Sequence, residues 1–286
     1  MQPYRFCRFF TLIITLIASL WSLTSHAFVV SIDEFSIVRN GAAFFTDGFG
    51  DGIVPPSGPN GAATYDVQGT IPGTAESGGL LVLDSANGEL SANALELARI
   101  ALRARLLTNI DPANLGAGLK SDDTLSLTGI FSLTMPSGVL NPQYSIRFND
   151  ASGGTGAQQV LQLQVRFDST TSLPEIRYIL QDFDANTITV LGSASFAPPS
   201  GADEILLNIK RPSAANNDFF ASFDYLSGGL SVGGGSSFAT PGAMFQGENF
   251  VRAEFNISDG VVPEPATLAL LFLGLAGLGF SRRKRV

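Results

Sequence analysis

Apolar and polar residues alternate along most of the chain with a period of two. Such alternation predicts β-strands that have one face on a core and one face away from it. The chain has no long stretch with the 3.6-residue apolar period of an amphipathic helix. The expected strands cover residues 32–38, 64–67, 80–84, 125–133, 144–148, 161–167, 176–180, 188–190, 205–209, 219–225 and 251–257, and a short apolar stretch at 43–46 follows the first of them.

The number of these strands predicts an all-β, antiparallel fold. One sheet alone cannot hide so much Leu, Ile, Val and Phe from water, so we expect two sheets that face each other as a β-sandwich. The 22 phenylalanines supply large buried area without a polar atom that needs a partner. The strands between residues 161 and 190 are expected to form a meander, and residues 28–260 are long enough for one such domain.

Residues 93–107 support two interpretations. Their Ala, Leu, Glu and Arg favour a helix. In a helix, however, the apolar residues would lie on two opposite sides instead of one stripe. A strand is therefore favoured, and it places Arg99, Arg103 and Arg105 in one row. That row is either a binding strip for an acidic exopolysaccharide or a solvated face paired with nearby acids.

The N-terminal residues have the three parts of a secretory signal peptide. Arg5 and Arg8 precede an apolar stretch at 9–23, and a small-x-small site ends at Ala27. We expect cleavage between Ala27 and Phe28. The cleaved segment contains the only cysteine, histidine and tryptophan of the chain, which are Cys7, His26 and Trp21.

Loss of these side chains restricts the chemistry of the mature chain. Without a thiol it forms no disulfide, has no cysteine nucleophile and has no thiolate metal site. Without an imidazole it has no Ser-His-Asp catalysis and no histidine-ligated zinc. Any bound metal has to be a hard cation on oxygen ligands, for which calcium is the candidate.

The charge of the predicted domain restricts its partners. Residues 28–260 contain 11 basic and 24 acidic residues, so their formal net charge is −13. An acidic domain repels phosphates, and we expect no nucleic-acid partner. The composition suits a soluble secreted protein that collects calcium.

The C-terminal residues form three physically different pieces in order. Two prolines with fixed φ and no amide donor flank a glutamate, then an uncharged apolar stretch at 267–280 favours a lipid environment, and a basic cluster follows that favours the cytoplasmic face. The stretch is shorter than the ~20 residues of an ordinary membrane-spanning helix. It predicts a hydrophobic helix that holds the chain at the membrane temporarily. The residues outside the apolar stretch are Pro263, Glu264, Pro265, Arg282, Arg283, Lys284 and Arg285.

This C-terminal pattern resembles the PEP-CTERM sorting signal of exported proteins in Gram-negative bacteria. The resemblance implies passage through a secretion translocon, processing near 263–265 by an exosortase-type enzyme, and release to the cell surface or extracellular matrix. The alternative is a plain tail anchor, which does not explain the Pro-Glu-Pro entry or the short span. The expected organisation is a signal peptide at 1–27, a β-sandwich at 28–260 and the sorting signal at 261–286.

The strand number and the opening Phe-x-x-Asp-Gly-Phe-Gly-Asp-Gly at 44–52 resemble the concanavalin A-like lectin and glucanase jelly roll. A glucanase of that fold would carry Glu-x-Asp-x-x-Glu on one strand, and this chain has no such run. We therefore expect a non-enzymatic glycan-binding or structural module. The alternative is a carbohydrate-active hydrolase that uses another carboxylate pair.

Two groups of oxygen ligands are candidate calcium sites. Asp47 and Asp51 lie in a glycine-rich loop, where they could hold the ion together with backbone carbonyls. Asp182, Asp184 and Asn186 have the alternation that opens a calcium loop, although Thr187 stands where such a loop needs glycine. In both places the alternative is an ordinary turn, since Asp, Asn and Gly are common turn residues. The glycine-rich residues 228–235 are expected to form a flexible hairpin loop.

Overall fold

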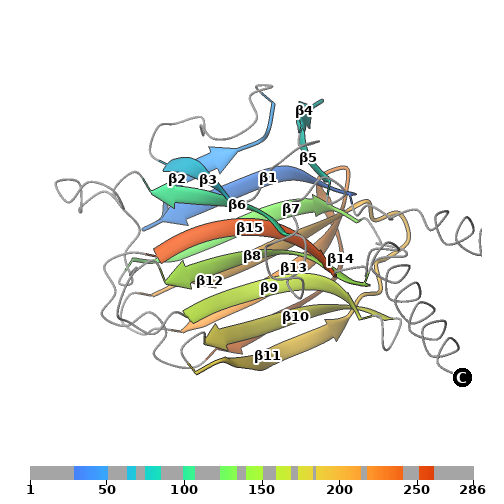
Figure 1. Cartoon of the computed structure of the whole chain (residues 1–286). Helices are drawn as coiled ribbons and strands as arrows, with labels where there is room; N and C mark the ends of the chain where they lie inside the picture. The colour runs from blue at the N-terminus through green and yellow to red at the C-terminus, as the bar shows by residue number, and fades with distance from the viewer. Residues whose placement is uncertain are drawn as a thin grey trace, which may run out of the picture. The chain divides into compact units, whose positions relative to one another are not determined.

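The described part of the chain is an antiparallel β-sandwich of two sheets (Figure 1). It comes from a computed structural model, which describes residues 29–50, 63–68, 75–84, 99–106, 123–133, 140–150, 159–168, 173–182, 185–213, 218–240 and 251–260. All of these residues belong to one compact unit, 27–260. Among them there is no helix, and so none that is long and apolar enough to cross a membrane. The predicted all-β antiparallel sandwich is confirmed, and its finer likeness to the concanavalin A-like jelly roll stays a prediction.

The first sheet has eight strands and contains the beginning of the described chain. In spatial order its strands are β14 (Leu230–Thr240), β13 (Phe219–Ser227), β12 (Glu204–Arg211), β7 (Leu125–Ser132), β1 (Val29–Arg39), β5 (Leu80–Asp84) and β4 (Ala75–Ser77), with β2 (Ala42–Asp47) paired to β1. Strand β7 alternates regularly between buried and half-buried positions. This is the pattern that period-two alternation predicts for a sheet with one face on the core.

The second sheet has seven strands and faces the viewer in Figure 1. In spatial order they are β11 (Thr187–Ser195), β10 (Leu173–Asp182), β9 (Gln159–Asp168), β8 (Leu140–Asp150), β15 (Val251–Gly260), β6 (Arg99–Leu106) and β3 (Ala63–Gln68). The predicted meander is confirmed as β9, β10 and β11, which pair antiparallel in order. For β3 and β6 only the backbone is described.

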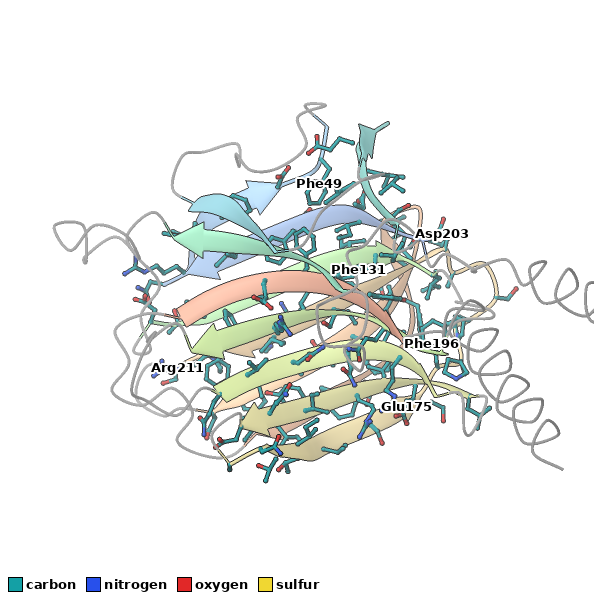
Figure 2. All side chains as sticks on the ribbon, viewed as in Figure 1. Phe49, Phe131, Glu175, Phe196, Asp203 and Arg211 are labelled. Carbon is teal, nitrogen blue, oxygen red and sulfur yellow. The ribbon has the colours of Figure 1, made fainter. Side chains whose placement is uncertain are left out.

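The core lies between the two sheets and is rich in aromatic rings. Phe35 of β1 meets Phe255 of β15 edge to face, with 4.8 Å between ring centroids. Phe131 of β7 packs on Tyr144 of β8 at 5.1 Å, and its position between the sheets can be followed in Figure 2. Each pair joins one sheet to the other, so aromatic contacts hold the two layers together.

The ambiguous segment around residue 100 is a strand. Strand β6 pairs with β15 on one side and with β3 on the other, which confirms the favoured interpretation over Arg99–Leu106. Residues 93–98 and 107 lie outside the described residues. A helix would have placed the apolar residues of this segment on two opposite sides. A strand inside a sheet accounts for their spacing instead.

Two expectations from the sequence are wrong, one for β11 and one for β14. Ile188 and Val190 do not face the core, because β11 has a bulge at Val190–Gly192 that leaves both side chains exposed. The glycine-rich residues 228–235 are not one flexible loop. Only Gly228 and Gly229 form the turn, and β14 begins immediately after them. Gly235 is required there, since a Cβ atom would lie 2.1 Å from the carbonyl oxygen of Phe223.

Candidate functional site: the outer rows of the seven-stranded sheet

Five of the eight buried polar or charged side chains of the described residues lie on the seven-stranded sheet, on the face opposite the core. We call these positions the outer rows; they alternate along each strand with the core-facing residues. One row crosses the sheet from Glu254 to Arg147, Gln162 and Ile179 in backbone register. Period-two geometry places the side chains of neighbouring strands in such a row about 5 Å apart.

The centre of the outer rows is a buried polar cluster. Arg147 of β8 forms an ion pair with Glu254 of β15, and both side chains are almost fully buried. Gln162 donates a hydrogen bond from Nε2 to the Ser145 hydroxyl over 2.8 Å. Gln164 is also buried. The sequence predicted polar residues on this face but did not predict that they would be shielded from water.

Beside this cluster lies a more accessible triad. Glu175 of β10 forms ion pairs with two arginines. Its Oε1 lies 3.2 Å from Arg177 Nε and 3.7 Å from Arg166 Nε. All three side chains are partly exposed. Figure 2 places Glu175 near the end of the sheet where β10 begins. Two cations share one carboxylate, so the triad keeps a net positive charge on an acidic domain.

Backbone register places further charged residues at positions of the same rows. The described outer rows contain seven arginine positions and four carboxylate positions, a formal excess of three positive charges. Residues 28–260 as a whole carry −13. The positions are Arg99, Arg103, Arg105, Arg147, Arg166, Arg177 and Arg252, against Asp66, Asp168, Glu175 and Glu254.

The corresponding face of the eight-stranded sheet is acidic. Burial raises the pKa of Glu204 on β12, and the nearby charges of Asp33 and Asp203 raise it further, while a backbone hydrogen bond from Gly229 opposes the shift. A carboxylate whose pKa is raised by neighbouring acids is repelled by their charges. The domain therefore separates its charge, with an acidic face on one sheet and arginine rows on the other.

The first candidate calcium position acts as a turn residue in this structure. Asp47 Oδ1 accepts a hydrogen bond from the Phe49 backbone N–H over 2.9 Å, and Asp47 is itself buried. Phe49 has a φ of 49° and packs on Phe255 in the core, where Figure 2 labels it. Asp51 lies outside the described residues, so calcium binding at Asp47 and Asp51 stays a prediction.

The second candidate calcium position has a similar turn geometry. Asp182 Oδ1 accepts a hydrogen bond from the Ala185 backbone N–H over 2.9 Å, and Asn186 has a φ of 51°. Both features are typical of a hairpin turn. Asp184 lies outside the described residues. Within the described ranges, no three acidic, histidine or cysteine residues gather as a metal site would require.

The predicted processing residues cannot be placed by the structure. Ala27 and Phe28, and the C-terminal residues from Pro263 to Arg285, lie outside the described residues. Arg99, Arg103 and Arg105 do share one side of β6 in backbone register, as the favoured strand required. Arg166 and Arg177 were not predicted as site residues from the sequence; the period-two positions of both residues were the available signal.

The comparison with protein-family models found a match at the C-terminal end of the chain. Residues 261–284 match the family model of the PEP-CTERM protein-sorting motif. The chain matches no curated protein. The motif match supports an exported protein that an exosortase-type enzyme processes and that is sorted at the membrane toward the cell surface.

Proposed function

We propose that this exported protein is a non-enzymatic module of a Gram-negative cell surface or extracellular matrix, and that the outer rows of its seven-stranded sheet bind an acidic polysaccharide. The observation that carries the proposal is the excess of arginine in these rows on a domain of net charge −13. The sorting motif supports the location, because it directs the chain toward the compartment that contains such polymers.

The chemistry of the triad suits carboxylate groups on a polymer. A guanidinium presents a planar fork of donors that matches a carboxylate, and Arg166 and Arg177 are both partly exposed. Glu175 holds the two guanidiniums in place, which reduces the conformational entropy lost on binding. A polymer that carries one carboxylate per sugar could engage Arg166 and Arg177 with neighbouring carboxylates at once.

The carboxylates of this face are poorly arranged for hydrolysis. A glycosidase needs two carboxyl groups about 5–9 Å apart, one of which has to carry a proton. Glu254 is buried, and its carboxylate is engaged in the ion pair with Arg147. The nearest carboxylate position in its row is Asp66, two strands away with Arg103 between them in register. These features support binding rather than catalysis.

Retention on polymers of different charge tests the proposal. The full chain is applied to immobilised alginate, a polyuronate, and to neutral dextran at increasing salt. We expect retention on alginate at low salt, a steep loss as salt screens the charges, and no retention on dextran. Equal retention on both polymers, or none on alginate, would contradict the proposal and leave a structural role.

Matched variants assign the binding to one face. Arg177→Gln removes one charge from the outer rows of the seven-stranded sheet, at a partly exposed guanidinium. Lys210→Gln removes an exposed charge from β12 on the opposite sheet. We expect retention on alginate to fall strongly only in the arginine variant. An equal loss in both variants would show that net charge alone decides the interaction.

Deletion tests the part of the proposal that concerns sorting. Removal of residues 261–286 takes away the matched motif and leaves the sandwich sequence intact. We expect the deleted protein to miss its final location and to lose the mass change that processing causes in the full chain. An unaltered location and the same mature mass as the processed full chain would contradict the assignment.

A further inference from the structure

All the exposed large hydrophobic side chains of the described residues belong to three strands, β10, β11 and β14. They are Leu173 at 66%, Ile188 at 62%, Val190 at 45%, Leu230 at 74% and Val232 at 41% exposure. Strands β11 and β14 are the last strands of their sheets. Phe238 of β14 packs on Gly192 of β11, where a Cβ atom would lie 2.4 Å from the Phe238 ring. The open edges of both sheets therefore lie on the same side of the sandwich.

Strand β11 has one of the features that protect the edges of soluble sheets, the bulge at Val190–Gly192, and lacks the others. Natural edge strands are short, are bulged, or carry charges, especially lysine, or prolines that prevent pairing with another strand. The opposite edges have such features: β4 has three residues, and β3 carries Asp66. Strand β11 has nine residues, Thr187–Ser195, with no charge and no proline. Thr, Ile and Val are moreover the residues that favour strands.

We propose that β11 is a self-association surface, on which β11 of a second copy pairs antiparallel about a two-fold axis at Thr189. This register brings Ile188 opposite the partner's Val190, and Val190 opposite the partner's Ile188. Ile188 and Val190 lie on the same side of β11, because they pair with Gln181 and Ile179 on the same side of β10. Both apolar side chains are then covered by cross-strand contacts.

The absence of charge on β11 makes this edge the place where a second copy meets the least repulsion. Two domains of net charge −13 repel each other, so contact is least costly where neither carries charge. Strand β11 is such a surface and is its own complement, as a two-fold interface requires. The pairing joins two seven-stranded sheets into one. It does not depend on polysaccharide binding, because β11 contributes no charge to the outer rows.

The mass of the full chain in solution tests the proposal. Light scattering during size-exclusion chromatography should give twice the chain mass for the natural protein. Val190→Lys places two like charges at the two-fold interface, and we expect it to weaken dimerisation by about tenfold or more. Leu173→Lys is the control, since it adds the same charge at a similarly exposed position outside β11. A monomeric natural protein, or association that Val190→Lys leaves unchanged, would overturn the proposal.

Disulfide cross-linking tests the register. In a Cys7→Ser background, Thr189→Cys places the new thiol beside the same thiol of the second copy at the two-fold axis. The two Cα atoms then lie within the ~7 Å that a disulfide can span. Ser193→Cys is the control on the same exposed strand; its two copies would be about 27 Å apart along the pair. We expect a covalent dimer from Thr189→Cys and not from Ser193→Cys. Equal cross-linking of both, or of Ser193→Cys alone, would overturn the pairing.

Discussion

The strands of both sheets alternate between core-facing and outward-facing residues, but the two sheets bury their outward-facing residues to different extents. On β7 of the eight-stranded sheet every second residue is buried, and the Ser, Thr and Ile residues between them are half-exposed. On β8 and β9 of the seven-stranded sheet, the outward Ser145, Arg147, Gln162 and Gln164 are buried as well. One sheet has a single buried face along these strands, and the other has two.

This difference shows what a period of two does and does not encode. Alternation decides which residues share a face of a strand. It does not decide whether the second face meets water. The chemical types of the outward residues carry that information: β7 has small hydroxyls, whereas β8, β9 and β15 have groups that satisfy one another, as in Arg147 with Glu254 and Gln162 with Ser145.

The largest expected effect comes from breaking the buried ion pair. Glu254→Gln leaves the Arg147 guanidinium buried without its counter-charge, and we expect a loss of about 3–5 kcal/mol in the free energy of unfolding. Denaturant unfolding measures it. The double change Arg147→Met with Glu254→Leu should recover most of the loss, because it removes both buried charges. A loss below about 1 kcal/mol for Glu254→Gln would mean that water reaches this face after all.

A smaller loss is expected from the neutral part of the same cluster. Gln162→Ala removes a buried amide and its hydrogen bond to Ser145, which should lower the free energy of unfolding by about 1–3 kcal/mol. The same unfolding experiment measures it. Ser222→Ala, on a half-buried outward position of β13, is the control and should change stability by less. Equal losses in the free energy of unfolding would mean that the outward faces of the two sheets are equally solvated, and would contradict the difference between them.

The outward face of the eight-stranded sheet has its own amide network, with better access to water. Asn208 of β12 donates from Nδ2 to the Ser126 hydroxyl at 2.8 Å, the Thr128 hydroxyl at 2.9 Å and the Leu127 carbonyl at 3.1 Å. Asn208→Ala should cost about 1 kcal/mol, since water can replace part of these bonds. Thermal unfolding of Asn208→Ala beside Gln162→Ala tests the order, and a larger loss for Asn208→Ala would reverse it.

The smallest effect is a pH dependence from the acidic face. Burial and the neighbouring acids hold the pKa of Glu204 above its ordinary value of 4.5. The folded protein then binds a proton at a pH where the unfolded chain does not, so this group stabilises the fold more as pH falls through the raised pKa toward 4.5. Glu204→Gln should reduce that gain and slightly stabilise the protein at pH 7. Melting temperatures of both proteins between pH 7 and 4.5 measure it; an identical pH dependence would contradict the repulsion.

The sequence predicts the fold well where strands are amphipathic. The core-facing residues of β7, β8, β9, β12 and β13 follow from their alternation alone. Strand β14 could not be predicted, because Gly233, Gly234 and Gly235 have no side chains that report a face. The bulge in β11 was equally hidden, because it is a property of the pairing between β11 and β10 and the local sequence carries no signal for it.

The candidate site was predictable only in part. The basic row on β6 follows from its strand period, and the turn roles of Asp47 and Asp182 were among the alternatives that the sequence allowed. The triad of Arg166, Glu175 and Arg177 required the register between β9 and β10, which is set by long-range pairing rather than by local composition. Charge separation between the two sheets emerges only when strands distant in sequence become neighbours.

Arginine labelling in the presence of a polyuronate tests the functional contrast between the two sheets most directly. Phenylglyoxal labelling of the full chain, read by mass spectrometry, compares Arg166 and Arg177 with Arg39, which is similarly exposed on β1 of the other sheet. We expect alginate to slow labelling of Arg166 and Arg177 several-fold and to leave labelling of Arg39 unchanged. Equal protection of all three arginines, or protection of none, would contradict this contrast.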